Sequence, residues 1–115
     1  MNSTKIELAP RLSPFKGVDM RIIGSGCSIT LIRMTIKPGS IFPEHTHNNE
    51  QVGTCLEGEG KLTSGGETID VTEGVSWTIP ANEPHSFVAT GDKNVIIIEC
   101  WSPPRKDYLS MAHKR

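Results

Sequence analysis

The amino-acid sequence predicts an all-β fold, either a sandwich or a small closed barrel of antiparallel strands. Eight short runs rich in β-branched residues are each of strand length and are bounded by turn residues. No helical periodicity of 3.6 residues is visible through residue 101. The 11 glycines and 8 prolines are spread along the chain as breaks between these runs. Many short strands at regular spacing are typical of these two architectures.

The predicted strands follow one another closely, and turn residues mark the breaks between them. They cover residues 18–23, 28–36, 51–56, 61–64, 68–71, 75–79, 86–89 and 95–101. Gly58 and Gly60 bracket one break, and Gly65-Gly66 predicts a hairpin because both positions can take a positive φ. A polar turn at residues 92–94 precedes the last and most apolar run.

The chain is predicted to form one domain, because residues 1–115 contain no repeat or linker and have the usual length of a single domain. A chain of this length can bury a core without disulfides or a structural metal. Residues 101–115 are expected to form a C-terminal tail, since Pro103-Pro104 cannot join a central strand. From residue 105 onward the tail is polar, and either a short helix or disorder fits it.

The charge balance and the lack of a long apolar stretch argue against two classes of partner, nucleic acid and a membrane. The chain carries 12 Lys and Arg against 13 Asp and Glu, a formal net charge of −1, so nucleic acid is not an expected partner. No apolar stretch is long enough to cross a membrane. The N-terminal segment is polar and includes Lys5 and Glu7, which is unlike a signal peptide.

The three cysteines predict a reduced, cytoplasmic protein. Cys27, Cys55 and Cys100 are odd in number, far apart and without a CxxC spacing. Neither a disulfide scaffold nor a zinc ribbon is therefore indicated. Each cysteine is expected to be a small core residue.

Two histidines and a glutamine form the first part of a predicted metal site. His45 and His47 are two residues apart, so in an extended chain both side chains point to the same face. Gln51 shares this parity, whereas Glu50 does not. If the segment is extended, Gln51 joins the histidines and Glu50 turns away. A turn at residues 48–49 would break this parity.

His85 is expected to supply a third imidazole from a later strand. Imidazole binds several divalent transition metals, whereas the amide oxygen of Gln51 is a weaker, neutral ligand. The site would hold one divalent ion, and nickel, zinc, iron and manganese all fit. Because the four ligands are neutral, the ion keeps its full dipositive charge. That charge favours an anionic ligand or a water of lowered pKa in the open positions.

A simpler interpretation of each feature remains open. The pattern HxH also arises by chance on surface loops, and His85, which follows Pro84, could be a turn residue with its own hydrogen bonds. His113 lies in the charged tail and is interpreted as solvated. The metal hypothesis therefore depends on the two segments together.

The segments 38–58 and 73–85 resemble the paired motifs of the cupin family. The matching residues are Gly39, His45, His47, Gln51 and Gly58 in the first motif, and Gly74, Pro80 and His85 in the second. Gln51 stands where the family has an acidic ligand. Asn82 stands where it has a turn glycine, and Asn tolerates a left-handed backbone. The resemblance implies a small antiparallel jelly-roll barrel, the double-stranded β-helix, with a metal inside its mouth.

The pectin-degradation proteins, a subgroup of cupins, are similar in their C-terminal run as well. Members of this subgroup convert unsaturated uronates from pectin or alginate into linear keto sugar acids. Residues 99–108 (ECWSPPRKDY) match their pattern, with Glu99 in place of Asp and Trp101 in place of Phe. The resemblance implies that Glu99, Trp101 and Arg105 line the site.

The residue types agree in part with these roles. Glu99 ends an apolar run, where a charge is costly unless it is paired or functional, and it could act as a general acid or base. Arg105 offers a planar fork for a substrate carboxylate. The alternatives are structural: Glu99 pairs with Arg21 or Arg33, Arg105 lies on the surface, and Trp101 closes the barrel end.

Three hypotheses of function follow. In the first, the protein is a metal-dependent, isomerase- or lyase-like enzyme that acts on a small carboxylate-bearing sugar such as an unsaturated uronate. The second is a metal-dependent oxygenase, although no 2-His-1-carboxylate triad is evident. The third is a barrel that binds a small molecule without catalysis. A homodimer is expected, because cyclic dimers are common and cupins of this kind pair through their sheets.

Overall fold

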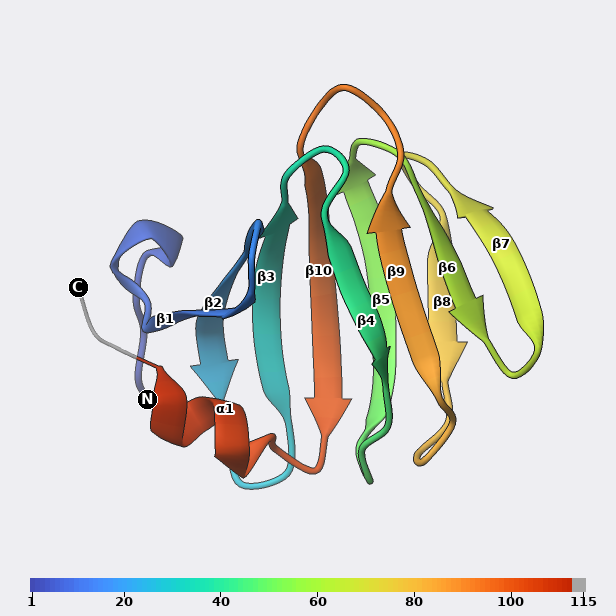
Figure 1. Cartoon of the computed structure of the whole chain (residues 1–115). Coiled ribbons are helices and arrows are strands. Elements are labelled where there is room, and N and C mark those ends of the chain that lie inside the picture. Colours follow the sequence, from blue (N-terminus) through green and yellow to red (C-terminus); the bar gives the residue numbers. More distant parts are fainter. Residues whose placement is uncertain (113–115) are drawn as a thin grey trace.

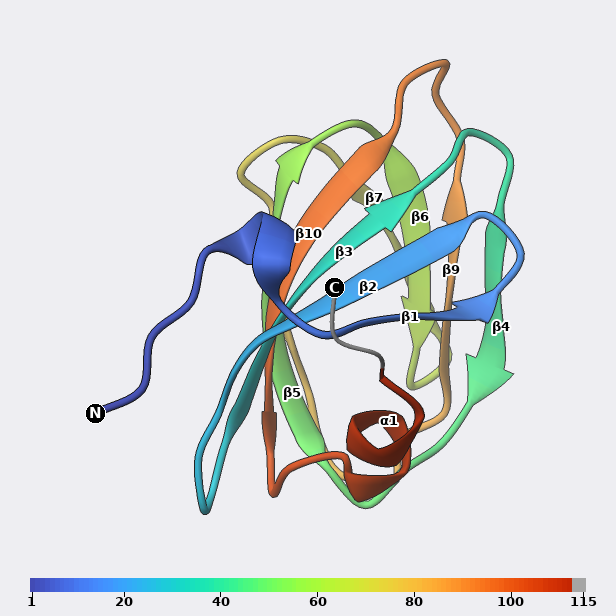
Figure 2. The same ribbon diagram turned by 90° about the vertical axis from the view of Figure 1, so that its left-hand side faces the viewer.

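The computed structural model describes residues 1–112 and contains two antiparallel β-sheets stacked face to face (Figures 1 and 2). The strands are β1 (Arg11–Phe15), β2 (Val18–Ser25), β3 (Thr30–Ile36), β4 (Ile41–His45), β5 (Glu50–Glu57), β6 (Gly60–Ser64), β7 (Glu67–Val71), β8 (Ser76–Ile79), β9 (His85–Ala89) and β10 (Val95–Ser102). A 3₁₀ helix (Ile6–Leu8) precedes the strands, and helix α1 (Lys106–Met111) follows them.

The larger sheet has the strand order β1-β2-β3-β10-β5-β8, and the smaller sheet has the order β4-β9-β6-β7. Strand β10 lies between β3 and β5, so strands far apart in sequence become neighbours. The chain crosses repeatedly from one sheet to the other, as Figure 2 shows. This arrangement confirms the predicted antiparallel jelly roll.

The inward faces of the two sheets form one core. Strand β10 alternates strictly between buried and partly buried positions from Val95 to Trp101, as expected of a strand with one face inside. Most buried side chains are apolar. The buried polar and charged residues are Thr30, Asn49, Gln51, His85, Glu99 and Arg105. The last four of these are residues that the sequence places in the site.

The structure contains all eight predicted strands and two more, β1 and β4. Both additional strands lie at a sheet edge, contain a proline (Pro14 and Pro43) and have an irregular register. Proline cannot donate to a sheet ladder, so it is tolerated at edges and bulges. The same prolines interrupt the sequence pattern by which strands are recognised, which explains why the prediction missed these two.

The C-terminal tail forms a helix in the part that the structure describes. Helix α1 lies at the end of the sandwich where β10 finishes and where β4 turns toward β5 (Figures 1 and 2). Its Tyr108 is buried, with its ring centroid 5.6 Å from that of Trp101. His113 lies outside the described residues.

All three cysteines are free thiols, but they do not share one environment. Cys55 is buried, Cys100 is partly buried and Cys27 is exposed, so the prediction of three core residues holds for Cys55 and was wrong for Cys27 and Cys100. Cys27 follows Gly26 in the turn between β2 and β3, outside the reach of the core. Neither of the two short helices in the described residues is long and apolar enough to span a bilayer.

Candidate metal centre

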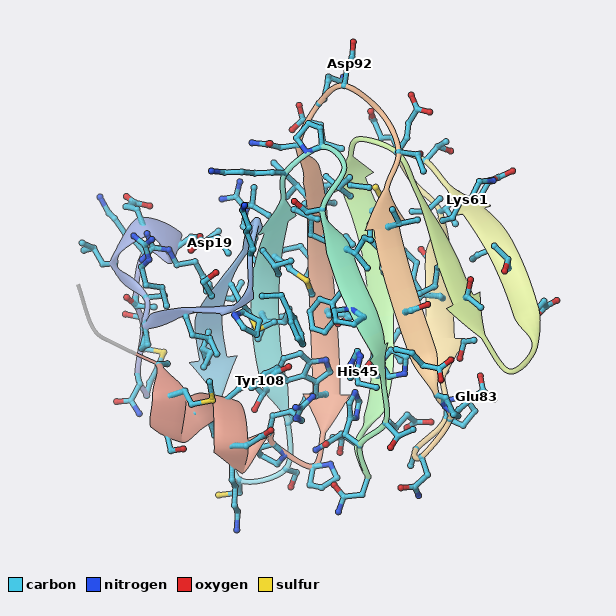
Figure 3. The ribbon with its side chains drawn as sticks, viewed as in Figure 1. Asp19, His45, Lys61, Glu83, Asp92 and Tyr108 are labelled. Atoms are coloured by element: carbon cyan, nitrogen blue, oxygen red, sulfur yellow. The ribbon has the colours of Figure 1, made fainter. Side chains whose placement is uncertain are left out.

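The three predicted histidines come together at one end of the smaller sheet. His45 ends β4, His85 begins β9, and the two residues are direct cross-strand partners. His47 lies in the loop after β4, where its carbonyl accepts a backbone hydrogen bond of 2.8 Å from Asn82. Asn82 has a φ of 68°, so it adopts the left-handed conformation that is expected at a turn position usually occupied by glycine. Figure 3 shows His45 toward the same end of the sandwich as Tyr108.

Each histidine offers one ring nitrogen to a common point. These nitrogens all lie within 4.8 Å of one another. The ring centroids are 4.2 Å apart for His45 and His85, 4.9 Å for His47 and His85, and 5.4 Å for His45 and His47. The three rings are therefore close enough to be candidate ligands of a single ion.

Backbone carbonyls fix the orientation of two of the rings. Nδ1 of His45 lies 2.8 Å from the carbonyl of Pro43, and Nδ1 of His85 lies 2.9 Å from the carbonyl of Glu83. A carbonyl only accepts, so each Nδ1 carries the proton and each Nε2 keeps its lone pair.

Two ring nitrogens are buried without a partner among the described residues, Nε2 of His85 and Nδ1 of His47. A buried nitrogen without a hydrogen bond is costly, and a bound ion would satisfy it. The residues therefore fit a metal.

The surroundings keep the three imidazoles neutral, which is the form that binds metals. Burial lowers the pKa of His45 and of His85. Burial and the nearby positive charge of Arg105 lower the pKa of His47 to about 4. At pH 7 all three side chains are therefore available as ligands without the prior loss of a proton.

Gln51 faces the interior although the chain is bent before it. Residues 46–49 are not part of a strand, so the predicted turn does interrupt the extended segment. Gln51 nevertheless points inward because β5 pairs it with buried Trp101 on one side and with Ile79 on the other. Glu50 is exposed.

Glu99 is buried and accepts three hydrogen bonds from side chains. Trp77 Nε1 and Gln51 Nε2 donate to Oε2 over 3.0 Å and 2.8 Å, and Trp101 Nε1 donates to Oε1 over 3.1 Å. Burial raises the pKa of Glu99, and these three bonds partly offset the shift. The structural alternative, in which Glu99 pairs with Arg21 or Arg33, is not what the structure shows, since neither arginine forms a hydrogen bond or ion pair with Glu99.

Trp77 is the residue of this group that the sequence reasoning missed. It lies on β8, where its parity with Ile79 predicts an inward side chain. A buried indole N–H usually has a hydrogen-bond acceptor, so the inward position of Trp77 could have indicated a polar partner in the interior. The partner itself could not be foreseen, since Glu99 lies 22 residues further along the chain.

Arg105 is only 8% exposed and lies on aromatic rings, so it is not a surface residue. Its guanidinium carbon is 3.9 Å from the ring centroid of Tyr108 and 5.3 Å from that of Trp101. Asp107 accepts from Nε over 3.0 Å and from Nη2 over 2.8 Å. These contacts leave the outer edge of the guanidinium free to bind an anion. The sequence reasoning missed the roles of Tyr108 and Asp107.

One cavity unites these groups. Its lining includes His45, His47, Gln51, His85, Glu99, Trp101 and Arg105, together with Trp77 and apolar residues such as Phe42 and Phe87. The cavity therefore combines a three-histidine cluster, a buried carboxylate and a guanidinium. Such a combination can hold an ion, bind an anionic ligand and move a proton.

Comparisons with known proteins identify relatives of this chain. A family model described as the cupin domain matches residues 32–101. The HTH-type transcriptional regulator PuuR of Escherichia coli is 34% identical over 92 residues, which cover 76% of this chain and 50% of that protein. The H2HPP isomerase of Bacillus subtilis is 31% identical over 67 residues, which cover 58% of this chain and 28% of that protein. The chain thus spans half or less of the length of these curated relatives.

A solved structure with a similar fold is that of KdgF from Halomonas sp. It superposes with a TM-score of 0.84 and covers 93% of this chain and 99% of that one. The sequence identity is 18%, so the likeness shows a shared fold.

Proposed function

The chain belongs to the cupin family, and from this premise we propose that it is a metal-dependent enzyme acting on a small carboxylate-bearing sugar. The observation that carries the proposal is the cavity in which three histidines, a buried carboxylate and a guanidinium meet. A cluster of imidazoles by itself supports only metal binding. Glu99 adds a group that can transfer a proton, and Arg105 adds a positive charge that can bind an anionic substrate.

His45, His47 and His85 would hold the ion, with Gln51 as a fourth ligand. One divalent ion, nickel, zinc, iron or manganese, suits these donors. When bound, the ion supplies Lewis acidity that polarises a carbonyl or ring oxygen.

Arg105 is the proposed anchor of the substrate carboxylate. Asp107 occupies Nε and one N–H of Nη2, which leaves both N–H groups of Nη1 and the second of Nη2. This remaining edge is the end-on fork that binds a carboxylate with two parallel hydrogen bonds. The aromatic rings of Tyr108 and Trp101 keep the fork in place at the cavity wall.

Glu99 is the proposed proton carrier. Oε2 already accepts two N–H bonds, whereas Oε1 accepts only the bond from Trp101. Oε1 therefore has room for a proton taken from or given to a substrate. The raised pKa of Glu99 brings the group closer to neutrality, where a general acid or base works best.

An unsaturated uronate is the proposed substrate, and its conversion to a linear keto sugar acid is the proposed reaction. The run from Glu99 to Tyr108 supports it, because the pectin-degradation cupins carry the same kind of acid, aromatic residue and arginine there. The shared fold with KdgF is compatible with this assignment. An oxygenase is less well supported, since the ligand cluster in the described residues contains three histidines and no carboxylate.

A second candidate function is ligand sensing, which the relation to PuuR favours. PuuR is a transcriptional regulator, and this chain matches about half of it. A cupin unit of such a protein would bind a small molecule without converting it. The same cavity would serve, with Arg105 as the anion-binding group.

The deciding experiment combines metal analysis with an anaerobic activity panel. Protein purified from its native host should contain close to one equivalent of a transition metal and convert an unsaturated uronate without consuming O₂. Gln51→Ala should lower the metal content, while Glu50→Ala, the matched control on the exposed side of β5, should leave it intact. Saturable binding of uronates without turnover would favour the sensor. Turnover that requires O₂ would favour the oxygenase.

A further inference from the structure

We propose that Glu99 and Trp77 act as a pair of positioning residues that fix the amide of Gln51, with its oxygen toward the three histidines. The inference rests on the proposed function, because it concerns how the metal site is held in shape. It assigns Glu99 a role that is separate from any proton transfer. It also gives Trp77 a role in the site.

The first step is the chemistry of the Gln51 contact. A carboxylate only accepts hydrogen bonds, so the amide group that faces Glu99 must be the NH₂. The contact is the Nε2–Oε2 bond of 2.8 Å. The amide oxygen then points away from Glu99, and Gln51 lines the same cavity as the three histidines. An amide rotated by 180° would bring two oxygens together in a buried site and would be repelled.

The second step is the way in which Glu99 itself is held. Trp77 Nε1 shares Oε2 with Gln51, so the oxygen that orients the amide is fixed from a second side. Residues that orient metal ligands from behind commonly change metal affinity when they are mutated. Trp77 is therefore expected to influence the metal without touching it.

The third step is the backbone that allows this contact. Gly53 on β5 is paired with Glu99 on β10 and with Trp77 on β8. A Cβ on Gly53 would lie 2.6 Å from Cγ of Glu99 and 2.8 Å from Nε1 of Trp77. The two side chains meet over β5 because no side chain stands between them.

The central test compares Glu99→Gln with Glu99→Met. Both variants remove the negative charge, but only the glutamine still presents an oxygen to Gln51 and Trp77. Zn²⁺ affinity would be measured by competition with a chelating indicator, and the visible absorption spectrum of the Co²⁺ form would report the ligand geometry. Glu99→Met should bind Zn²⁺ about 10–100-fold more weakly than Glu99→Gln, and its Co²⁺ spectrum should change. Equal affinities would show that the acceptor oxygen at position 99 has no effect on the metal site and would overturn the inference.

A second arm follows Gln51 in the metal-free protein by NMR. Its side-chain amide signals, identified by their loss in Gln51→Ala, should be protected from hydrogen exchange in wild type and in Glu99→Gln. They should exchange rapidly in Glu99→Met. Equal exchange in all three proteins would overturn the inference. This arm needs neither a metal nor a substrate, so it stays informative if the proposed function fails. A wild-type protein that binds neither Zn²⁺ nor Co²⁺ would refute the metal-dependent function.

A variant at Gly53 keeps the inference testable if Glu99→Met does not fold. Gly53→Ala leaves Glu99 and Trp77 in the sequence but places a methyl group between them. It should weaken Zn²⁺ binding and increase amide exchange at Gln51. Gly26→Ala is the matched control, because a Cβ there meets no atom closer than 3.9 Å. Wild-type Zn²⁺ affinity in Gly53→Ala would overturn the inference.

Discussion

The Glu99 carboxylate combines burial with an unusually full set of donors. Three N–H groups surround it, yet burial still raises its pKa. An isolated carboxylate in such a place would be strongly destabilising, and the donors make the charged form acceptable. The buried position of Glu99 therefore determines its pKa.

The first prediction at this scale concerns catalysis. Glu99→Gln removes the titratable carboxyl group, which could transfer a proton, but keeps an acceptor oxygen. On whichever uronate is a substrate, the variant should keep the fold and the metal and lose about 10²–10⁴-fold in kcat. Circular dichroism and metal analysis would serve as controls. Turnover near that of the wild type would remove Glu99 from the mechanism.

The second prediction concerns Arg105. Replacing it with Ala removes a hydrogen-bonding group for the substrate carboxylate that acts equally in the ground state and the transition state. KM for a carboxylate-bearing substrate should rise with little change in kcat. The matched control is a neutral sugar of the same size, whose binding should not change. A large fall in kcat at unchanged KM would contradict an anchoring role.

The third prediction concerns pH and the metal-free protein. The pKa of His47 is about 4 in the folded state against an ordinary value of 6.5, so the unfolded chain takes up the proton first as the pH falls. The free energy of unfolding should therefore decline between about pH 6.5 and about pH 4. The pKa values of His45 and His85 are also lowered in the folded state, so both residues likewise reduce the free energy of unfolding as the pH falls. Glu99, whose pKa is raised, acts in the opposite direction and destabilises the fold as the pH rises above 4.5.

The contribution of His47 is isolated by comparing wild type with His47→Asn. Urea unfolding of both proteins in the presence of a chelator should show a gap in stability that changes between pH 7 and pH 4. The wild type should lose more stability than the variant over this range. Parallel curves would contradict the depressed pKa.

At the scale of the elements, the two sheets contribute different parts of the site. The smaller sheet supplies His45 and His85 from the paired strands β4 and β9. The larger sheet supplies Gln51, Trp77 and Glu99 from the neighbouring strands β5, β8 and β10. The packing of one sheet on the other therefore brings the ligands and the acid into one cavity.

Packing within the smaller sheet depends on Gly60, at the start of β6. A Cβ at this position would lie 2.1 Å from Cζ of Phe87 and 2.6 Å from the carbonyl oxygen of Val88. Phe87 lies on the neighbouring strand β9 and lines the cavity. The lack of a side chain at Gly60 thus allows Phe87 to lie where it lines the cavity.

The fourth prediction follows from this contact. Gly60→Ala should lower the free energy of unfolding by about 1–3 kcal/mol, since the ring and the backbone must move to admit the methyl group. Gly91→Ala is the control, because a Cβ there makes only ordinary contacts at 3.5 Å. Equal unfolding midpoints in denaturant for the two variants would show that Phe87 yields without cost.

At the scale of the whole molecule, the outer face of the larger sheet is more apolar than a solvated sheet requires. Val52 and Leu56 on β5 are 49% and 50% exposed. Cys100 on β10 lies between Val52 on one side and Leu31 of β3 on the other. We define Leu31, Val52, Leu56 and Cys100 as the outer patch. Exposed apolar patches of this kind often mark protein–protein contacts.

The fifth prediction is a homodimer that forms through the outer patch. Light scattering should give twice the chain mass of 12.6 kDa at working concentration. Val52→Lys should shift the protein toward the monomer, because the new charge would be buried between the two copies. Thr68→Lys, at an exposed position of β7 in the smaller sheet, is the control. A monomer mass for the wild type would refute the dimer.

The sequence by itself determined the strands with uninterrupted patterns and the residue types of the site. Alternation and turn residues are local properties, so β2, β3 and β5–β10 could be predicted from short stretches of chain. The spacing of His45 and His47 indicated a shared direction for the same reason. Edge strands β1 and β4 escaped, because proline and an irregular register weaken the local pattern.

Only the tertiary structure decided which of these residues meet. Glu99 is 48 residues from Gln51 and 22 from Trp77, yet hydrogen bonds join all three. The strand order places β10 and β8 on either side of β5, and Gly53 leaves space between them. Strand order and sheet packing depend on the whole chain, and no local pattern records them. For that reason the sequence named Glu99, Gln51 and Trp101, but neither Trp77 nor the hydrogen bonds that join these residues.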